Sequence, residues 1–307
     1  MKASRTAEFA KDAGYEALLE KVNEEVEGWG EEDDSTPSRT ILFVVGAPRS
    51  GTTLLYQLLA ATGSFHYPTN LIARFYRSPA WGGRMQRLLE PLLNRGDMSY
   101  SSRAGNTEQW WGPHEFGYFW EHHFDFRDHH EPEAPDLAGL VRSLAAFEKE
   151  GEGPLLFKNP ILSFVVEDLA RALPSARFLW TQRPSLDLAA SIYQTRIRFH
   201  GDPGAWLSLR PRDAQEGAPP AEQIAHQIRR AHEALSRARD RLGDRFAEVD
   251  YLEICRRPEG ALRIAEELVG TSLGGTHLPG SFTPSQPTSE PSVRRELEAA
   301  LREEGML

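Results

Sequence analysis

Residues 41–63, with the sequence ILFVVGAPRSGTTLLYQLLAATG, constrain the fold of this chain more than any other segment. Five apolar residues lead into a loop with two glycines, and a helical pattern follows that ends at Gly63. A helix that begins directly after such a loop offers its first backbone amides and the positive end of its dipole to an anion. The segment therefore predicts a strand, a phosphate-binding loop and a helix within an α/β domain.

The loop lacks the lysine that ATP- and GTP-binding loops carry. The pattern GxxxxGK[ST] requires Lys after its second glycine, but Gly46 and Gly51 are followed by Thr52. The only cation in the loop is Arg49, whose planar guanidinium suits phosphate or sulfate. A turn that binds nothing is the alternative, although polar donors in an apolar segment favour an anion. The hydroxyl donors are Ser50, Thr52 and Thr53.

A second candidate anion site lies in FLWTQRPSLDLAASIYQTR. Arg183 stands at the carboxyl end of an expected strand, where open α/β sheets place their ligands. Asp187 and Ser191 are four residues apart on the following helix, so they share a face. Arg183 and Ser191 can therefore hold a second phosphate, or Asp187 merely caps the helix or neutralises Arg183.

Strands and helices alternate again from Gly153 onward. This alternation is typical of a parallel sheet with helices on both faces. The expected strands are residues 154–160, 176–183 and 246–254. The expected helices are residues 161–173, 185–199, 221–242 and 258–270, with a final charged helix after the proline-rich stretch 278–292.

We expect one large domain preceded by a helix and a linker. Residues 1–30 have apolar side chains at helical spacing, and residues 30–39 are acidic and rich in turn formers. Residues 1–37 are therefore expected to form an N-terminal helix and linker, and residues 38–307 the domain. Turn signals among many aromatics in residues 64–135 indicate a helical insertion, or lid, with irregular loops.

Composition excludes several classes of protein. The net charge of -10 argues against a nucleic-acid partner, because phosphate-backbone binding usually needs a basic excess. The single cysteine, Cys255, excludes internal disulfides and cysteine-built metal sites. The N-terminus is charged throughout, unlike a signal peptide, and no apolar run is long enough to span a membrane. These features predict a cytoplasmic protein.

Four segments in order along the chain resemble the PAPS-dependent sulfotransferases, in particular the bacterial type with a PRSGTT loop. They are PRSGTT, the block that runs from LLFKNP to TQRP, RPSLDLAAS and YLEICRRPEG. The second and third segments share the residues RP. The resemblance covers about residues 40 to 270. It implies a P-loop-like three-layer α/β domain, with a central parallel sheet flanked by helices and a helical lid insertion.

The resemblance implies PAPS, 3′-phosphoadenosine 5′-phosphosulfate, as the donor, with no metal required. Arg183 and Ser191 match the residues that hold the 3′-phosphate in the family. Arg49 and Lys158 match cations that stabilise charge on the oxygen between phosphate and sulfur, unless Lys158 is an ordinary strand-end surface lysine. The loop residues expected to bind the 5′-phosphosulfate are Pro48, Arg49, Ser50, Gly51, Thr52 and Thr53.

Sulfuryl transfer needs a base that takes the proton of the acceptor hydroxyl. Family members use His or Glu, and the lid sequence EQWWGPHEFGYFWEHH offers both among aromatic residues. We favour Glu115 or His114, with His66 as a further candidate. Each of these three side chains could instead be packed or solvated without a catalytic role.

Two histidine patterns do not predict a metal site. HEFGY lacks the second His of HExxH, because residue 118 is Tyr. The adjacent pairs His122-His123 and His129-His130 point apart on regular structure, so a solvated acidic loop is the better interpretation.

The sequence also departs from the family pattern. Leu54 replaces the aromatic residue that often follows the two threonines, which leaves Tyr251 as the best candidate to stack on adenine. The C-terminal Arg-Lys-Gly element that contacts the 3′-phosphate in cytosolic members is absent. Arg294 and Arg295, or residues 281–289, are alternatives for closing the site.

These features predict a sulfotransferase that moves a sulfuryl group from PAPS to a hydroxyl acceptor. The aromatic lid suggests a small organic alcohol or phenol, while a carbohydrate, a protein tyrosine or a carrier-tethered acyl chain stays open. The rivals are an ATP-dependent small-molecule kinase with a degenerate loop and a non-catalytic PAP-binding scaffold. The N-terminal helix either docks a carrier protein or other partner, or simply packs on the domain.

Overall fold

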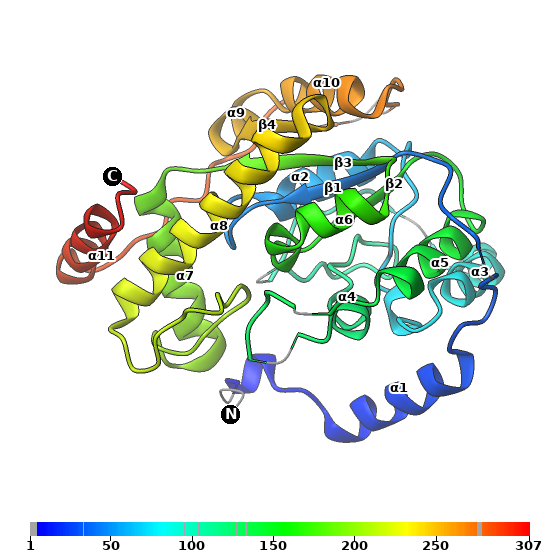
Figure 1. Cartoon of the computed structure of the whole chain (residues 1–307), viewed down its shortest axis with the longest axis horizontal. Helices are drawn as coiled ribbons and strands as arrows, with labels where there is room; N and C mark the ends of the chain where they lie inside the picture. The colour runs from blue at the N-terminus through cyan, green and yellow to red at the C-terminus, as the bar shows by residue number, and fades with distance from the viewer. Residues whose placement is uncertain are drawn as a thin grey trace.

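The structure, a computed structural model, describes residues 5–307 apart from residues 33, 95, 104, 127, 133 and 275–277. Its described part contains a sheet of four parallel strands in the order β2-β1-β3-β4, with helices on both faces (Figure 1). The predicted three-layer α/β architecture is therefore confirmed. The strands are β1 (Ile41–Val45), β2 (Leu155–Lys158), β3 (Ala176–Gln182) and β4 (Phe246–Asp250).

The carboxyl ends of the four strands meet at one edge of the sheet. Val44 of β1 pairs with Lys158 of β2, and Gln182 of β3 pairs with Asp250 of β4. Because all four strands are parallel, the residue after each strand emerges at this edge, where ligands bind in open α/β sheets. Those residues are Gly46, Asn159, Arg183 and Tyr251.

Alternate residues of each buried strand face opposite layers of helices. On one face, Phe43 stacks between Phe157 and Phe178, with ring centroids 5.7 and 5.4 Å apart. On the other face, Leu42 and Val44 pack in a separate apolar cluster. The first face is covered by α4 (Gly117–Phe124), α5 (Leu137–Glu148), α6 (Val166–Ala172) and α8 (Pro220–Leu242), and the second by α2 (Thr52–Ala61) and α10 (Pro258–Val269).

The predicted lid, residues 64–135, combines short helices with long irregular loops. Its helices are η2 (Ile72–Arg74), α3 (Pro79–Leu89), η3 (Glu90–Leu92) and α4. The Asn70 amide donates to the carbonyl oxygens of Thr107 and Gln109, at 3.0 and 2.6 Å. These bonds satisfy buried backbone groups that no helix or strand would pair, so the loop before α4 has a defined course.

The N-terminal helix is shorter than predicted. A 3-10 turn, η1 (Ala7–Phe9), precedes α1 (Ala13–Val26), and residues 1–4 lie outside the described part. The Asp12 carboxylate accepts the Tyr15 amide and thereby sets the start of α1. Asn23 on α1 donates to the Arg74 carbonyl at 2.8 Å and accepts the Arg77 amide at 2.9 Å. The helix therefore packs against the lid, far from α10 (Figure 1).

Two predicted boundaries were wrong. The strand expected over 246–254 ends at Asp250, because that carboxylate accepts the amides of Leu252 and Glu253 and caps α9 (Tyr251–Arg256). The helix expected over 161–173 is divided into η4 (Pro160–Phe164) and α6. Helix α5 was not predicted, although Asp136 caps it by accepting the Gly139 amide.

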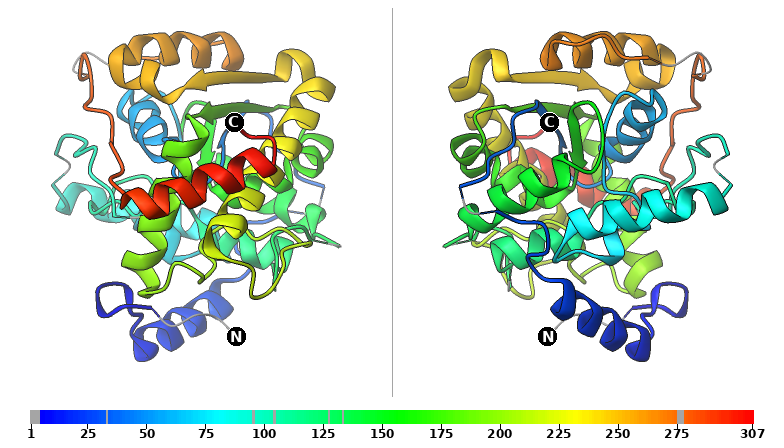
Figure 2. Two further views of the ribbon diagram at one scale, coloured as in Figure 1. Left: turned by 90° about the vertical axis from the view of Figure 1, so that its left-hand side faces the viewer. Right: turned by 90° about the vertical axis from the view of Figure 1, so that its right-hand side faces the viewer.

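The remaining helices are α7 (Ser185–His200), predicted over residues 185–199, and α11 (Pro291–Glu303), predicted as a final charged helix without bounds. The short turn η5 (Gly243–Arg245) before β4 was not predicted. Helix α11 packs against α7 and α8, as Figure 2 shows from the side. Within the described ranges, no helix is long and apolar enough to cross a bilayer.

Candidate functional site

The loop after β1 depends on two glycines. At Gly46, an added Cβ would lie 2.6 Å from Ser50 Oγ and 2.9 Å from the Thr181 carbonyl oxygen, so no side chain fits. Gly51 precedes α2 with a φ of 101°, a left-handed conformation that glycine adopts without strain. The glycines thus allow the chain to turn tightly and to direct the first amides of α2 toward one point.

Buried hydroxyl groups anchor this loop to the neighbouring elements. Ser163 Oγ accepts the Gly46 amide at 3.1 Å and donates to the Gly46 carbonyl at 3.2 Å. Ser50 Oγ lies 2.8 Å from Thr181 Oγ1 of β3. The Ser50 amide donates to the Ala47 carbonyl at 3.2 Å, so the amide and the hydroxyl of Ser50 both hold the loop in its conformation. Neither Ser163 nor Thr181 carried a signal in the sequence, because both act across more than a hundred residues.

The two predicted anion-binding segments meet in space. Arg49 Nε donates to Ser191 Oγ at 3.3 Å, and Arg183 Nη1 donates to the Arg49 carbonyl at 3.2 Å. Arg49 has a φ of 72°, which is uncommon for a residue other than glycine and is found most often at functional sites. Burial lowers the pKa of the Arg49 guanidinium, and the nearby charge of Arg183 lowers it further. Two cations held this close favour an anion between them.

Arg183 is buried, with 7% of its surface exposed. Its Nη2 donates to the Ser285 carbonyl at 2.5 Å, and its guanidinium lies 4.7 Å from the centre of the Tyr251 ring. Among the described residues, no ion pair joins Arg183 to Asp187, so the alternative in which Asp187 neutralises Arg183 has no support.

Tyr251 lies at this site, and its stacking on adenine stays a prediction. The ring is only 6% exposed, one face is covered by Arg183, and an edge lies against Gly51. Tyr251 Oη accepts the Ser285 amide at 2.8 Å. Tyr251 thus contacts both the first loop, at Gly51, and the segment that contains Ser285. The segment 281–289 reaches the site through Ser285, whereas Arg294 and Arg295 lie on α11.

Lys158 ends β2 beside the loop. Only 2% of it is exposed, so the alternative of an ordinary surface lysine is wrong. Its Nζ donates to Thr53 Oγ1 at 2.9 Å and forms an ion pair with Glu115. Burial lowers the pKa of the Lys158 ammonium, while the Glu115 carboxylate opposes this change. The pair places a cation and a carboxylate beside the start of α2.

Glu115 is held in place from several sides. Its carbonyl accepts Asn159 Nδ2 at 3.1 Å and Trp120 Nε1 at 3.2 Å, which fixes the backbone just before α4. Its carboxylate packs on Gly105, where an added Cβ would overlap Oε1 and lie 3.0 Å from Cδ. Neither Gly105 nor Asn159 was predicted to belong to this site, because no motif or periodicity marks them.

The two candidate histidines are placed differently from Glu115. His114 Nδ1 accepts the Phe116 amide at 2.9 Å, so the proton of the neutral ring lies on Nε2 and no basic nitrogen is free. His66 bonds the Phe147 carbonyl through Nε2 and pairs with Leu155, at the amino end of β2. His66 is therefore at the opposite end of that strand from Lys158. Burial lowers the pKa of both rings to about 4.

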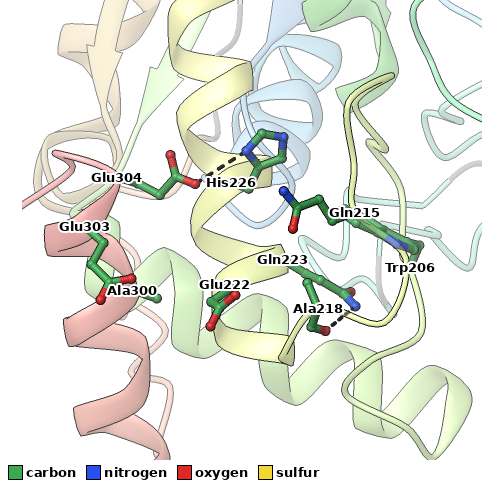
Figure 3. A pocket seen from close by; sticks show the side chains of 9 residues that line it. All are labelled: Trp206, Gln215, Ala218, Glu222, Gln223, His226, Ala300, Glu303 and Glu304. Carbon is green, nitrogen blue, oxygen red and sulfur yellow. Dashed lines mark hydrogen bonds and ion pairs between the residues drawn. The ribbon is translucent and has the colours of Figure 1, made fainter.

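The site is distinct from a cleft of about 290 Å³ between α8, α11 and the loop before α8. In that cleft the Glu304 carboxylate points toward His226, and none of the residues above lines it (Figure 3). A search of the described residues found no group of three or more His, Cys, Asp or Glu side chains that could hold a metal ion.

Comparison with known proteins agrees with this geometry. The sequence profile described as "Sulfotransferase family" matches residues 42–273. Among solved structures, sulfotransferase STF9 from Mycobacterium avium is similar, with a TM-score of 0.53 and 19% identity over 87% of this chain and 68% of that one. Sulfotransferase STF1 from Mycobacterium tuberculosis H37Rv gives a TM-score of 0.54 and 16% identity over 87% and 72%. At such identities the likeness shows a shared fold. No curated protein matches by sequence.

Proposed function

The chain belongs to the sulfotransferase family, and on this premise we propose that it transfers a sulfuryl group from PAPS to a hydroxyl acceptor, releasing PAP. One observation carries the proposal. Arg49 of the first loop donates to Ser191 of the second motif, and Arg183 donates to the Arg49 backbone. Two anion-binding elements that are far apart in sequence thus form one site, as a donor with two separate phosphate groups requires.

The residues present fit such a donor. The tight turn at Gly46 and Gly51 leaves the first amides of α2 for the 5′-phosphate, with the hydroxyls of Thr52 and Thr53. Arg183 and Ser191 are the residues for the 3′-phosphate. PAPS would supply the sulfuryl group itself. The absence of a lysine after Gly51 agrees with a donor that has no γ-phosphate.

Arg49 and Lys158 have the charge needed beside the bond that breaks. When a sulfuryl group leaves, negative charge develops on the oxygen that linked it to phosphate, and fixed cations lower the energy of that transition state. Both side chains are already held, Arg49 by Ser191 and Lys158 by Thr53 and Glu115. Because they are preorganised, little reorganisation is needed during transfer.

Glu115 is our candidate for the base. Its carboxylate is next to Lys158 and near Thr53, whereas the His114 ring has no free basic nitrogen and His66 lies elsewhere. A carboxylate in hydrogen-bond reach of the acceptor hydroxyl can take its proton. Many aromatic side chains in the lid favour a small organic alcohol or phenol as acceptor.

Two alternative functions predict different results. A small-molecule kinase would prefer ATP with Mg²⁺ to PAP, and a PAP-binding scaffold would bind PAP but transfer no label from PAPS to any acceptor. Docking of a carrier protein or other partner through α1 also remains a proposal, supported by the exposure of Tyr15 and Leu18 on that helix. A cytoplasmic location is proposed because Cys255 is a free, buried thiol.

Calorimetry with PAP and with ATP-Mg²⁺ tests the proposed function directly. We expect PAP to bind tightly, and Arg183→Ala to weaken it by at least tenfold, because a charge-assisted bond to a phosphate is lost. Arg263→Ala, an exposed arginine on α10, is the matched control and should leave PAP binding unchanged. A preference for ATP-Mg²⁺ over PAP would overturn the proposal. Labelled PAPS in an unbiased acceptor screen then identifies the acceptor.

A further inference from the structure

We propose that the cleft between α6 and α8 is a second anion site, separate from the site above. The cleft has a volume of about 330 Å³ and lies where α6 packs against α8 (Figure 1). Three of its lining residues are arginines, namely Arg171, Arg237 and Arg241. None of them belongs to the loops that we assign to PAPS.

The charges in this cleft do not cancel. Arg241 pairs with Glu167 across the two helices, and Arg171 pairs with Asp168 within α6. Arg237 has no hydrogen-bond or ion-pair partner among the described residues, so three cations face two carboxylates. A local excess of positive charge is unusual in a chain whose net charge is -10. Such a cleft attracts anions.

The geometry of the donors indicates the class of ligand. Guanidinium groups offer paired N–H donors that match the oxygens of phosphate and sulfate. Arg237 and Arg241 are four residues apart on α8 and so lie on one face, opposite Arg171 on α6. The cleft is large enough for a tetrahedral oxyanion, either free or at the end of an ester.

The cleft is connected to the loop after β1 through Ser163. This residue lines the cleft, is 1% exposed, and exchanges two hydrogen bonds with the backbone of Gly46. An anion that draws α6 and α8 together would therefore also restrain the turn that begins the phosphate-binding loop. Binding at the two sites is then coupled, and the coupling must be reciprocal.

Isothermal titration with sodium sulfate, against sodium chloride at equal ionic strength, tests for this site. The protein carrying Arg49→Ala and Arg183→Ala should still bind one sulfate, because the first site is disabled and the cleft is intact. Adding Arg171→Ala and Arg237→Ala to that protein should remove this remaining binding, with affinity reduced at least tenfold. Arg263→Ala should behave as the unaltered chain. These titrations do not depend on the identity of the donor.

Thermal unfolding provides a second readout if a variant is hard to titrate. Saturating sulfate should raise the midpoint of the Arg49→Ala, Arg183→Ala protein by roughly 2–4 °C, and adding Arg171→Ala and Arg237→Ala should remove this shift. Inorganic phosphate and 4-nitrophenyl sulfate in parallel distinguish a free oxyanion from an ester. The proposal is overturned if the protein with all four substitutions keeps the sulfate affinity of the Arg49→Ala, Arg183→Ala protein, or if the Arg49→Ala, Arg183→Ala protein binds no sulfate.

Discussion

Lys158 and Glu115 form an ion pair in which the lysine is almost fully buried. A buried charge is costly unless a partner of opposite charge is held close by. Here the partner is the residue that precedes Phe116 and α4 in the lid, so the pair also joins the lid to the end of β2. We expect substitutions at Lys158 or Glu115 to lower the rate of sulfuryl transfer more than they lower the affinity for the donor.

Replacement of Glu115 tests its role as the base. For Glu115→Gln we expect turnover to fall by about 10²–10⁴-fold, because the amide cannot take a proton, while PAP affinity changes by less than about threefold. Initial rates with labelled PAPS and calorimetry with PAP measure the two quantities. Glu108→Gln, on the same segment and paired with Arg103 at the surface, is the control. Full activity of Glu115→Gln would exclude Glu115 as the base.

Arg49 is expected to act mainly in the transition state. Arg49→Ala should lower turnover by about 10²–10³-fold, because a fixed cation beside the developing charge is lost. PAP affinity should fall by only a few-fold, since the loop amides and Arg183 remain. Single-turnover rates at saturating PAPS separate the two effects. Equal losses in rate and in affinity would mean that Arg49 only binds the donor.

Gly105 should be needed to position the Glu115 carboxylate. Gly105→Ala places a Cβ too close to Oε1 and 3.0 Å from Cδ, so the flexible carboxylate must move from its place beside Lys158. We expect turnover to fall about tenfold or more, with PAP affinity unchanged. The residue also has a φ of 96°, so alanine adds backbone strain of about 1–2 kcal/mol.

Gly217→Ala separates backbone strain from displacement of the carboxylate. Gly217 has a φ of 76°, and a Cβ there meets nothing within 4 Å. Both variants should lose similar stability in urea unfolding, but only Gly105→Ala should lose turnover. Similar turnover in the two variants would show that contact with Gly105 does not position Glu115.

Local patterns in the sequence were enough to predict much of the fold and part of the site. The strand, loop and helix around Gly46 and Gly51 are consecutive, so glycine spacing and apolar periodicity identify them. Arg183 follows its strand directly, and parallel pairing brings it to the same edge. The end of β4 also had a local signal, since Asp250 and Glu253 have the spacing of a capping box before α9.

The contacts that complete the site have no local signal. Ser163 anchors Gly46 from 117 residues away, and Ser285 meets Arg183 across 102 residues. Neither periodicity nor motif spacing reports which side chains meet in three dimensions. For the same reason the sequence left His66 beside Glu115 as a candidate base, although the pairing of His66 with Leu155 directs it to the other end of β2.

His66 should instead contribute to the dependence of stability on pH. Burial lowers its pKa from 6.5 to about 4 in the folded chain, so below about pH 6.5 the unfolded chain binds a proton that the folded chain does not. Stability is therefore retained above the unfolded pKa and is lost as pH falls through the folded pKa. From about pH 7 to about pH 5, we expect His66 to account for a loss of roughly 1–2 kcal/mol.

Urea unfolding of His66→Gln across this range measures that contribution. The variant should lose less stability between about pH 7 and about pH 5 than the unaltered chain, by roughly 1–2 kcal/mol. His114 and His123, whose pKa values burial also lowers to about 4, keep part of the acid sensitivity in place. Turnover at neutral pH should stay within about twofold, because His66 lies away from Lys158. An unchanged pH slope would show that His66 is not buried as a neutral ring, and a large loss of turnover would return it to the active site.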